Sequence, residues 1–99
     1  MNSILQKNKR CLVCLKETDL HLHHIYEGAG RRMQFSDRYG LTVWLCSRHH
    51  NMPQGETKMC VHYDSKFDKA LKKAAQERAM KHYGWNNEEW IKKCGKSYL

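Results

Sequence analysis

The sequence has no apolar run long enough for a membrane span or a secretory signal peptide. A transmembrane helix needs roughly 20 apolar residues, and residues 1–10 contain no apolar run long enough for a signal peptide. The sequence also lacks internal repeats and low-complexity tracts. We therefore expect one domain over residues 1–99, in the cytoplasm and without membrane contact, with residues 1–10 as a basic lead-in or frayed arm.

Acidic residues are scarce relative to basic ones. The chain has 10 Asp and Glu against 18 Lys and Arg, which gives a formal net charge of +8. Such an excess attracts polyanions, most often nucleic acid, although a soluble basic protein without such a partner has the same balance. The hydrophobic fraction of 40% fits a folded domain rather than a disordered chain. A chain this short buries a modest core and often needs a metal or a disulfide for stability.

The cysteines number five, an odd count that fits a disulfide framework poorly. Cys11-Leu12-Val13-Cys14 has the two-residue gap that lets two thiolates bind one ion. A redox pair uses the same spacing, but no βαβ pattern surrounds this one. Cys46-Ser47-Arg48-His49 repeats the gap and ends in histidine. Because zinc prefers four nitrogen or sulfur ligands in a tetrahedron, we predict a structural zinc site with the ligands Cys11, Cys14, Cys46 and His49.

Other interpretations of the cysteines stay open. The four predicted ligands are also compatible with two unrelated pairs of small buried thiols. Cys60 and His62 form a rival pair for zinc, and Cys94 is expected to be a core residue.

The hydrophobic pattern predicts a β-hairpin followed by helices. Apolar residues recur from Leu20 to Ile25, and residues 41–45 are rich in β-branched and aromatic side chains, so we expect two paired strands joined by a long loop. A helix or helical turn is expected to open at residue 47. Apolar residues then recur at helical spacing over 65–83, up to a C-cap at Gly84. Residues 86–94 predict a short terminal helix.

The loop expected between the strands carries three arginines, Arg31, Arg32 and Arg38. A guanidinium group offers a planar fork of donors to phosphate oxygens, so these residues are candidate nucleic-acid contacts. The alternative is an ordinary solvated loop.

Histidines surround the predicted zinc ligands. His23 and His24 are adjacent, so on a strand their side chains face opposite sides and cannot both bind one ion unless the backbone bends. This favours a division of labour between them, with His50 facing back over the hairpin. His21 shares a face with His23 and is either a further ligand or a surface residue. A structural role is favoured for His62 and His82, with metal or phosphate contact as the alternative for His62.

Three motifs together resemble the HNH, or ββα-metal, nuclease superfamily. They are Cys11-x-x-Cys14, then His23-His24-Ile25, then Leu45-Cys46-x-x-His49-His50-Asn51. More narrowly, the chain is similar to small HNH-like proteins encoded by bacteriophages and prophages, which also carry stretches like Val61-His62-Tyr63-Asp64 and the terminal Gly95-Lys96-Ser97-Tyr98-Leu99. The resemblance spans residues 11–99, and the HNH core motif covers 11–51.

This resemblance implies an α+β fold. Residues 11–55 would form a small ββα-metal (HNH-like) core held together by zinc, and 60–99 a C-terminal extension with an amphipathic helix and a short terminal helix. By position, His23 and His50 would bind a catalytic divalent ion (Mg²⁺, Mn²⁺, Ni²⁺ or Zn²⁺). His24 would be the general base for hydrolysis of DNA phosphodiester bonds, in the cytoplasm of a bacterial host.

The sequence departs from the family pattern at one position. The family often has an asparagine on the second strand that orients the base, and Leu41 stands there. The alternative function is therefore a catalytically silent zinc-binding module that binds nucleic acid or a host or phage protein. We identify no base-reading helix, and the oligomeric state is open.

Overall fold

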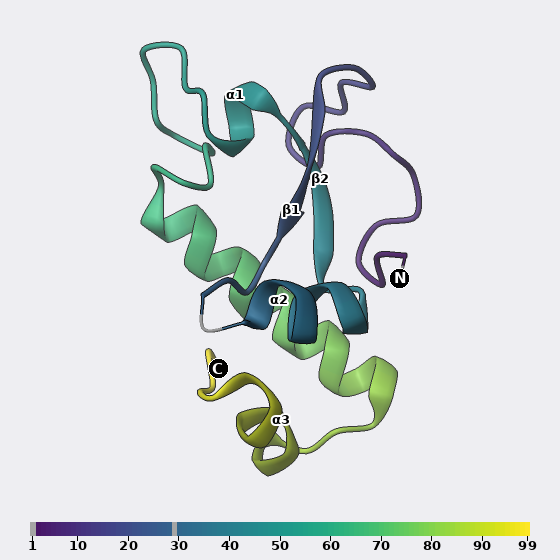
Figure 1. Ribbon diagram of the computed structural model, residues 1–99. Helices are drawn as coiled ribbons and strands as arrows, with labels where there is room; N and C mark the ends of the chain where they lie inside the picture. The colour runs from purple at the N-terminus through teal and green to yellow at the C-terminus, as the bar shows by residue number, and fades with distance from the viewer. Residues whose placement is uncertain (1, 29) are drawn as a thin grey trace.

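The computed structural model describes residues 2–28 and 30–99 and has an α+β fold (Figure 1). In chain order the elements are β1 (Leu20–His24), the π-helix η1 (Arg32–Asp37), β2 (Thr42–Cys46), α1 (Ser47–His50), α2 (Ser65–Tyr83) and α3 (Asn87–Cys94). Met1 of the predicted lead-in and Ala29 of the predicted loop lie outside the described residues. The expected fold class is confirmed at the level of a two-stranded antiparallel sheet with helices.

The predicted hairpin is present. β1 and β2 pair antiparallel, with Leu20 opposite Cys46 at one end and His24 opposite Thr42 at the other. Val43 and Leu45 are fully buried, in line with the preference of branched side chains for a half-buried sheet. This register places Cys46 at the end of the hairpin where β1 begins.

The segment between the strands was expected to be a loop, and that prediction was wrong for residues 32–37. They form η1, which buries Phe35 and Ser36. The Ser36 hydroxyl accepts a hydrogen bond from the Tyr26 N–H at 2.9 Å and donates one to the Tyr26 carbonyl at 2.6 Å. η1 has no side-chain cap and no acidic residue in its first turn, so the usual sequence signals of a helix start are missing.

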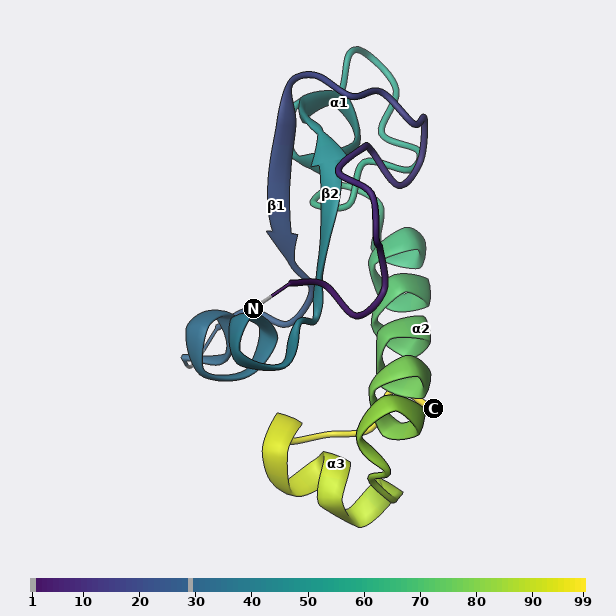
Figure 2. The same cartoon turned by 90° about the vertical axis from the view of Figure 1, so that its right-hand side faces the viewer.

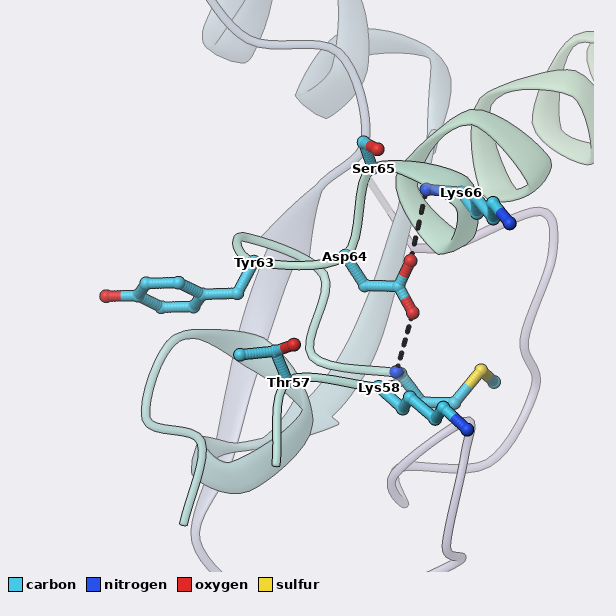
Figure 3. A pocket seen from close by; sticks show the side chains of 7 residues that line it. Thr57, Lys58, Tyr63, Asp64, Ser65 and Lys66 are labelled. Carbon is cyan, nitrogen blue, oxygen red and sulfur yellow. Dashed lines mark hydrogen bonds between the residues drawn. The ribbon is translucent and has the colours of Figure 1, made fainter. Parts of the chain in front are cut away.

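The two C-terminal helices agree with the prediction and have clear start signals. Asp64 caps α2, because its carboxylate accepts from the N–H group of Lys66 (Figure 3) and from those of Phe67 and Met59. Asn86 and Glu89 form a reciprocal capping box at the start of α3. Gly84 ends α2 in the left-handed region with φ of 70°, which glycine adopts without strain.

The core is formed by the hairpin together with α2 and α3. α2 runs beside the hairpin, and α3 folds back at its far end (Figures 1 and 2). Leu71, Ala75 and Ala79 of α2 join the buried set. Trp90 of α3 is fully buried, with its ring 5.3 Å from that of Tyr26. Burying a large apolar side chain contributes roughly 1.5–3 kcal/mol, so these contacts fix α2 and α3 against the hairpin.

The lead-in packs along β2 instead of fraying. The Ile4 N–H donates to the Gly40 carbonyl at 2.9 Å, and the Trp44 N–H donates to the Gln6 side chain at 2.8 Å. A Cβ at Gly40 would lie 2.5 Å from the Asn2 carbonyl oxygen, so only glycine allows this close approach. Within the described residues, every helix is too short or too polar to cross a membrane.

Candidate metal centres

The four predicted zinc ligands gather at one end of the hairpin. Cys14 Sγ lies 3.8 Å from Cys46 Sγ, and His49 Nδ1 lies 3.6 Å from Cys11 Sγ and 3.3 Å from Cys46 Sγ. The four ligand atoms all lie within 4.8 Å of one another. We call these residues the Cys₃His group. It has the donors to hold a metal ion such as zinc.

Local backbone geometry explains why these ligands converge. The Leu12 N–H donates to the Trp44 carbonyl at 2.9 Å, which ties the first knuckle to β2. The Leu15 N–H returns to the Cys11 carbonyl at 2.9 Å and closes the turn. Cys46 is both the last residue of β2 and the residue before α1, so His49 follows it within one helical turn. Each two-residue gap thus turns both of its ligands toward the same point.

The spacing of the Cys₃His group fits tetrahedral coordination. With bonds of about 2.3 Å to sulfur and about 2.0 Å to nitrogen, tetrahedral ligand atoms lie about 3.5–3.8 Å apart. The observed separations of 3.3, 3.6 and 3.8 Å are close to these values. All five cysteines are free thiols, so the three in this group are available as ligands.

The surroundings of Cys11 favour the thiolate form that metal binding requires. Burial acts to raise the pKa of Cys11, but backbone hydrogen bonds from Cys14, Cys46 and Val13 outweigh it and lower the pKa to about 6. Burial raises the pKa of Cys46, and the neighbouring thiols act in the same direction. A divalent cation would relieve this crowding of sulfur atoms.

A second group joins three histidines from different parts of the chain. His62 Nε2 lies 3.1 Å from His50 Nε2, and the ring of His23 lies 5.3 Å from that of His50 and 5.4 Å from that of His62. One ring nitrogen of each lies within 4.8 Å of the others. We call these residues the three-histidine group. His23 and His50 were the predicted ligands of a second ion, and His62 is the member for which a structural role was favoured.

Two backbone hydrogen bonds bring His62 into the group. The Val61 N–H donates to the His49 carbonyl at 2.9 Å, and the His62 N–H donates to the His50 carbonyl at 3.1 Å. Residues 61–62 therefore pair with α1 across a separation of 12 residues. The spacing of residues in the sequence does not predict this pairing. The signal for it in the sequence was the resemblance of Val61-His62-Tyr63-Asp64 to a stretch in the phage proteins.

His23 is the buried member of the three-histidine group. Its exposed fraction is 2%, and both of its ring nitrogens lack a hydrogen-bond partner among the described residues. Leaving a buried polar atom unpaired costs about 1–3 kcal/mol. Burial lowers the pKa of His23 to about 3, with the charges of His50 and His62 acting in the same direction. A neutral, unpaired imidazole is the form that binds a metal.

The spacing within the three-histidine group fits a metal ion as well. With metal–nitrogen bonds of about 2.1 Å, adjacent ligands lie about 3.0 Å apart in an octahedron and about 3.4 Å apart in a tetrahedron. The 3.1 Å between His50 and His62 lies between these values. Imidazole donors suit zinc or nickel better than magnesium, which prefers oxygen.

His21 lies outside the three-histidine group but contacts it. Its Nδ1 is 2.8 Å from Nδ1 of His50, on the opposite side of the His50 ring from the Nε2 that faces His62. The second nitrogen of a metal-bound histidine commonly has such a partner, which fixes the ring orientation. Burial lowers the pKa of His50 to about 4, and the neighbouring imidazoles of His62 and His21 add to this.

Comparison with protein-family models, curated proteins and solved structures gives no match for this chain. Its function must therefore be inferred from its own side chains.

His24, the predicted general base, has different neighbours. It lies beside His23 on β1, so its side chain faces the other side of the hairpin. Its Nε2 is 3.6 Å from the Asp37 carboxylate at the end of η1. The ring contacts of the histidine cluster join His21, His23, His50 and His62. The structure thus supplies His24 with a carboxylate partner, which sequence reasoning missed because η1 was expected to be a loop.

Leu41, at the position where the family often has asparagine, is fully buried in the core. The three arginines differ in their surroundings. Arg31 donates to the Cys94 carbonyl at 3.1 Å and so connects the segment before η1 to the end of α3. Arg32 and Arg38 are exposed and remain the candidates for phosphate contact. The guanidinium of Arg38 lies 5.6 Å from the ring of Tyr39.

One cavity adjoins the three-histidine group. It measures about 190 Å³ and is lined by His23, Ile25, Glu27, Val61, His62, Asp68 and Lys72. A cavity of about 440 Å³ near the start of α2 (Figure 3) and one of about 550 Å³ beside the lead-in are larger, but neither has a cysteine or histidine in its lining. Of these three cavities, the smallest is therefore the one that lies next to the candidate metal-binding histidines.

Proposed function

We propose that this protein is a metal-dependent endonuclease of the ββα-metal type that hydrolyses phosphodiester bonds in DNA. The observation that carries the proposal is the three-histidine group, with a buried unpaired imidazole, next to a closed Cys₃His group. A divalent ion held by these three imidazoles would supply positive charge to a phosphate group undergoing hydrolysis. In this proposal zinc occupies the Cys₃His group and has a structural role.

The division between the two groups supports a catalytic role for the second. The Cys₃His group offers four protein ligands, the number that structural zinc sites use, whereas the three-histidine group leaves a coordination position for substrate or water. His49 and His50 are adjacent in α1, so the first group fixes the position of the second. The net charge of +8, together with exposed Arg32 and Arg38, favours DNA as the substrate.

The proposed base is His24. It would take a proton from the attacking water, and the Asp37 carboxylate at 3.6 Å would orient its ring. Asp37 would thereby orient the base, as asparagine does in nucleases of this type, since Leu41 cannot form hydrogen bonds through its side chain.

The test is plasmid cleavage with Mn²⁺, Mg²⁺, Ni²⁺ or Zn²⁺ by the unchanged protein, His24→Ala and His82→Ala. His82 is an exposed histidine of α2 and is the matched control. Loss of general-base catalysis is expected to slow cutting by about 10²–10⁴-fold in His24→Ala, whereas His82→Ala should cut normally. Equal cutting by all three proteins would refute the role of His24, and no cutting with any ion would refute the nuclease.

The position of His24 favours a second candidate function, a catalytically silent zinc module that binds nucleic acid. His24 faces away from the three-histidine group and has 10% of its side chain exposed. Binding of DNA that weakens steeply with salt, without cleavage under any of the conditions above, would support this candidate over the first.

A further inference from the structure

We propose that the cavity beside the three-histidine group is a phosphate subsite, in which the ammonium group of Lys72 binds an oxygen of the substrate's phosphodiester. The inference rests on the proposed function, since it names the chain's own cation for the anionic substrate. Lys72 is a residue of α2, one helical turn after Asp68.

The lining of the cavity singles out Lys72. Among the described residues that line it, Lys72 carries the lone permanent positive charge, and His23 and His62 lie in the same lining. Lys72 is close enough to His23 for its charge to act on that imidazole. The cavity volume of about 190 Å³ compares with about 30 Å³ for one water molecule, so a phosphate group fits. An oxygen bound there would lie between the ammonium group and the imidazoles.

A hydrogen bond to Asp68 holds the Lys72 side chain in place. Asp68, one helical turn earlier, accepts a hydrogen bond from Lys72 Nζ at 2.9 Å. The side chains of the pair are 24% and 28% exposed, so their electrostatic interaction is less screened than on an open surface. An ammonium group has three donors, and the bond to Asp68 leaves others for a ligand.

The backbone at Lys72 is also fixed relative to the histidines. The buried Tyr26 hydroxyl donates to the Lys72 carbonyl, and Tyr26 follows His23 by three residues. The position of α2 against β1 is therefore set at the residue whose side chain lines the cavity. Such fixed placement is what an anion-binding group needs, because little ordering remains to be done when the ligand arrives.

The cavity lining alone has two carboxylates, Asp68 and Glu27, against the one ammonium group of Lys72, so an anion would be attracted by Lys72 acting together with an ion held by the imidazoles. Asp68 neutralises part of the Lys72 charge, and Glu27, which is exposed, adds a negative charge that solvent screens. A phosphate group therefore meets favourable charge at Lys72 and at whatever ion the three imidazoles hold. An anionic ligand that bridges the two would be bound more tightly than by either alone.

The experiment measures binding rather than turnover. The Ni²⁺-loaded protein is titrated with inorganic phosphate, and separately with a thymidine dinucleotide, by calorimetry. The variants are Lys72→Met, Lys72→Arg and the matched control Lys73→Met, whose lysine is the exposed neighbour on the same helix. Loss of one charge-assisted hydrogen bond should weaken both ligands about tenfold in Lys72→Met. Lys72→Arg should recover most of the affinity, and Lys73→Met should bind like the unchanged protein.

Nickel content and far-ultraviolet circular dichroism must be equal in all four proteins for the comparison to hold, and Lys72→Gln replaces Lys72→Met if that variant fails to fold. Unchanged affinity in Lys72→Met, equal losses in Lys72→Met and Lys73→Met, or failure of the unchanged protein to bind the dinucleotide would overturn the subsite. Plasmid cleavage is measured in parallel. Lys72-dependent binding without cleavage would remove the proposed nuclease and leave the subsite, whereas cleavage with Lys72-independent binding would do the reverse.

Discussion

The two candidate metal groups stand side by side on α1 but differ in how complete they are. The Cys₃His group has four ligands from two local turns and sits at the end of the hairpin. The three-histidine group has three ligands from β1, α1 and the segment before α2, and a cavity beside it. The first joins two local turns through the hairpin and has four ligands, whereas the second joins three segments and has three ligands beside a cavity. This difference is the one that separates structural from catalytic metal sites.

The largest expected effect is on stability when the Cys₃His group is broken. Cys46→Ala should lose bound zinc and most of the folded population, because structural zinc contributes about 10 kcal/mol or more in small domains. Zinc content and the unfolding temperature measure this. The matched control is Cys60→Ala, a buried cysteine outside the group, which should keep zinc and lose only about 1 kcal/mol. Equal zinc content in Cys46→Ala and the unchanged protein would contradict the assignment.

A smaller effect is expected when the three-histidine group loses the ligand that the sequence did not single out. His62→Ala should weaken binding of Ni²⁺ by about 100-fold or more, while zinc in the Cys₃His group and the fold are retained. Competition with a chromophoric chelator measures the affinity, and His82→Ala serves again as control. If His62→Ala bound nickel normally, the group would consist of the two predicted ligands only.

Acid should destabilise the protein through His23 when its group holds no ion. The pKa of His23 is lowered to about 3 by burial, whereas an unfolded histidine titrates near 6.5. The unfolded state therefore binds more protons below about pH 6.5, and stability falls as the pH drops toward 3, by about 2 kcal/mol at pH 5. Urea unfolding at pH 7 and pH 5 measures this. His23→Gln should lose less stability over the same interval, and an equal loss would assign the effect to other groups.

The smallest effect is expected for His21, which contacts His50 without joining the group. His21→Ala should weaken Ni²⁺ binding by about tenfold, because the ring of His50 loses the partner of its second nitrogen. His21→Asn retains a hydrogen-bonding group and should lose less. A loss in His21→Ala as large as that in His62→Ala would make His21 a ligand.

Elements that are stabilised by local interactions could be predicted from the sequence, whereas those that depend on distant contacts could not. The hairpin, α2 and α3 carry local signals, such as branched residues in strands and Asp64, Asn86 and Gly84 at helix ends. Each half of the Cys₃His group was also predictable, since a two-residue gap brings its ends together in almost any turn, and the predicted hairpin brings the two halves to one place. These features need little information from the rest of the chain.

The features that were missed depend on distant contacts. η1 is stabilised by burial of Phe35 and by the bonds between Ser36 and Tyr26, which no local pattern encodes. Asp37 could not be connected with His24 while η1 was taken for a loop. His62 reaches the other histidines through backbone pairing with α1, and such pairing has no side-chain signature. The open site was therefore only partly predictable, whereas the closed one could be predicted from spacing.

The adjacency of His49 and His50 has a consequence for how the protein would acquire its metals. Neighbouring Cα atoms are held about 3.8 Å apart by a planar peptide, so an ion that anchors one imidazole also restricts the other. Affinities coupled in this way change by the same factor in both directions. Removing one metal would therefore weaken the binding of the other, by the same factor whichever of the two is removed.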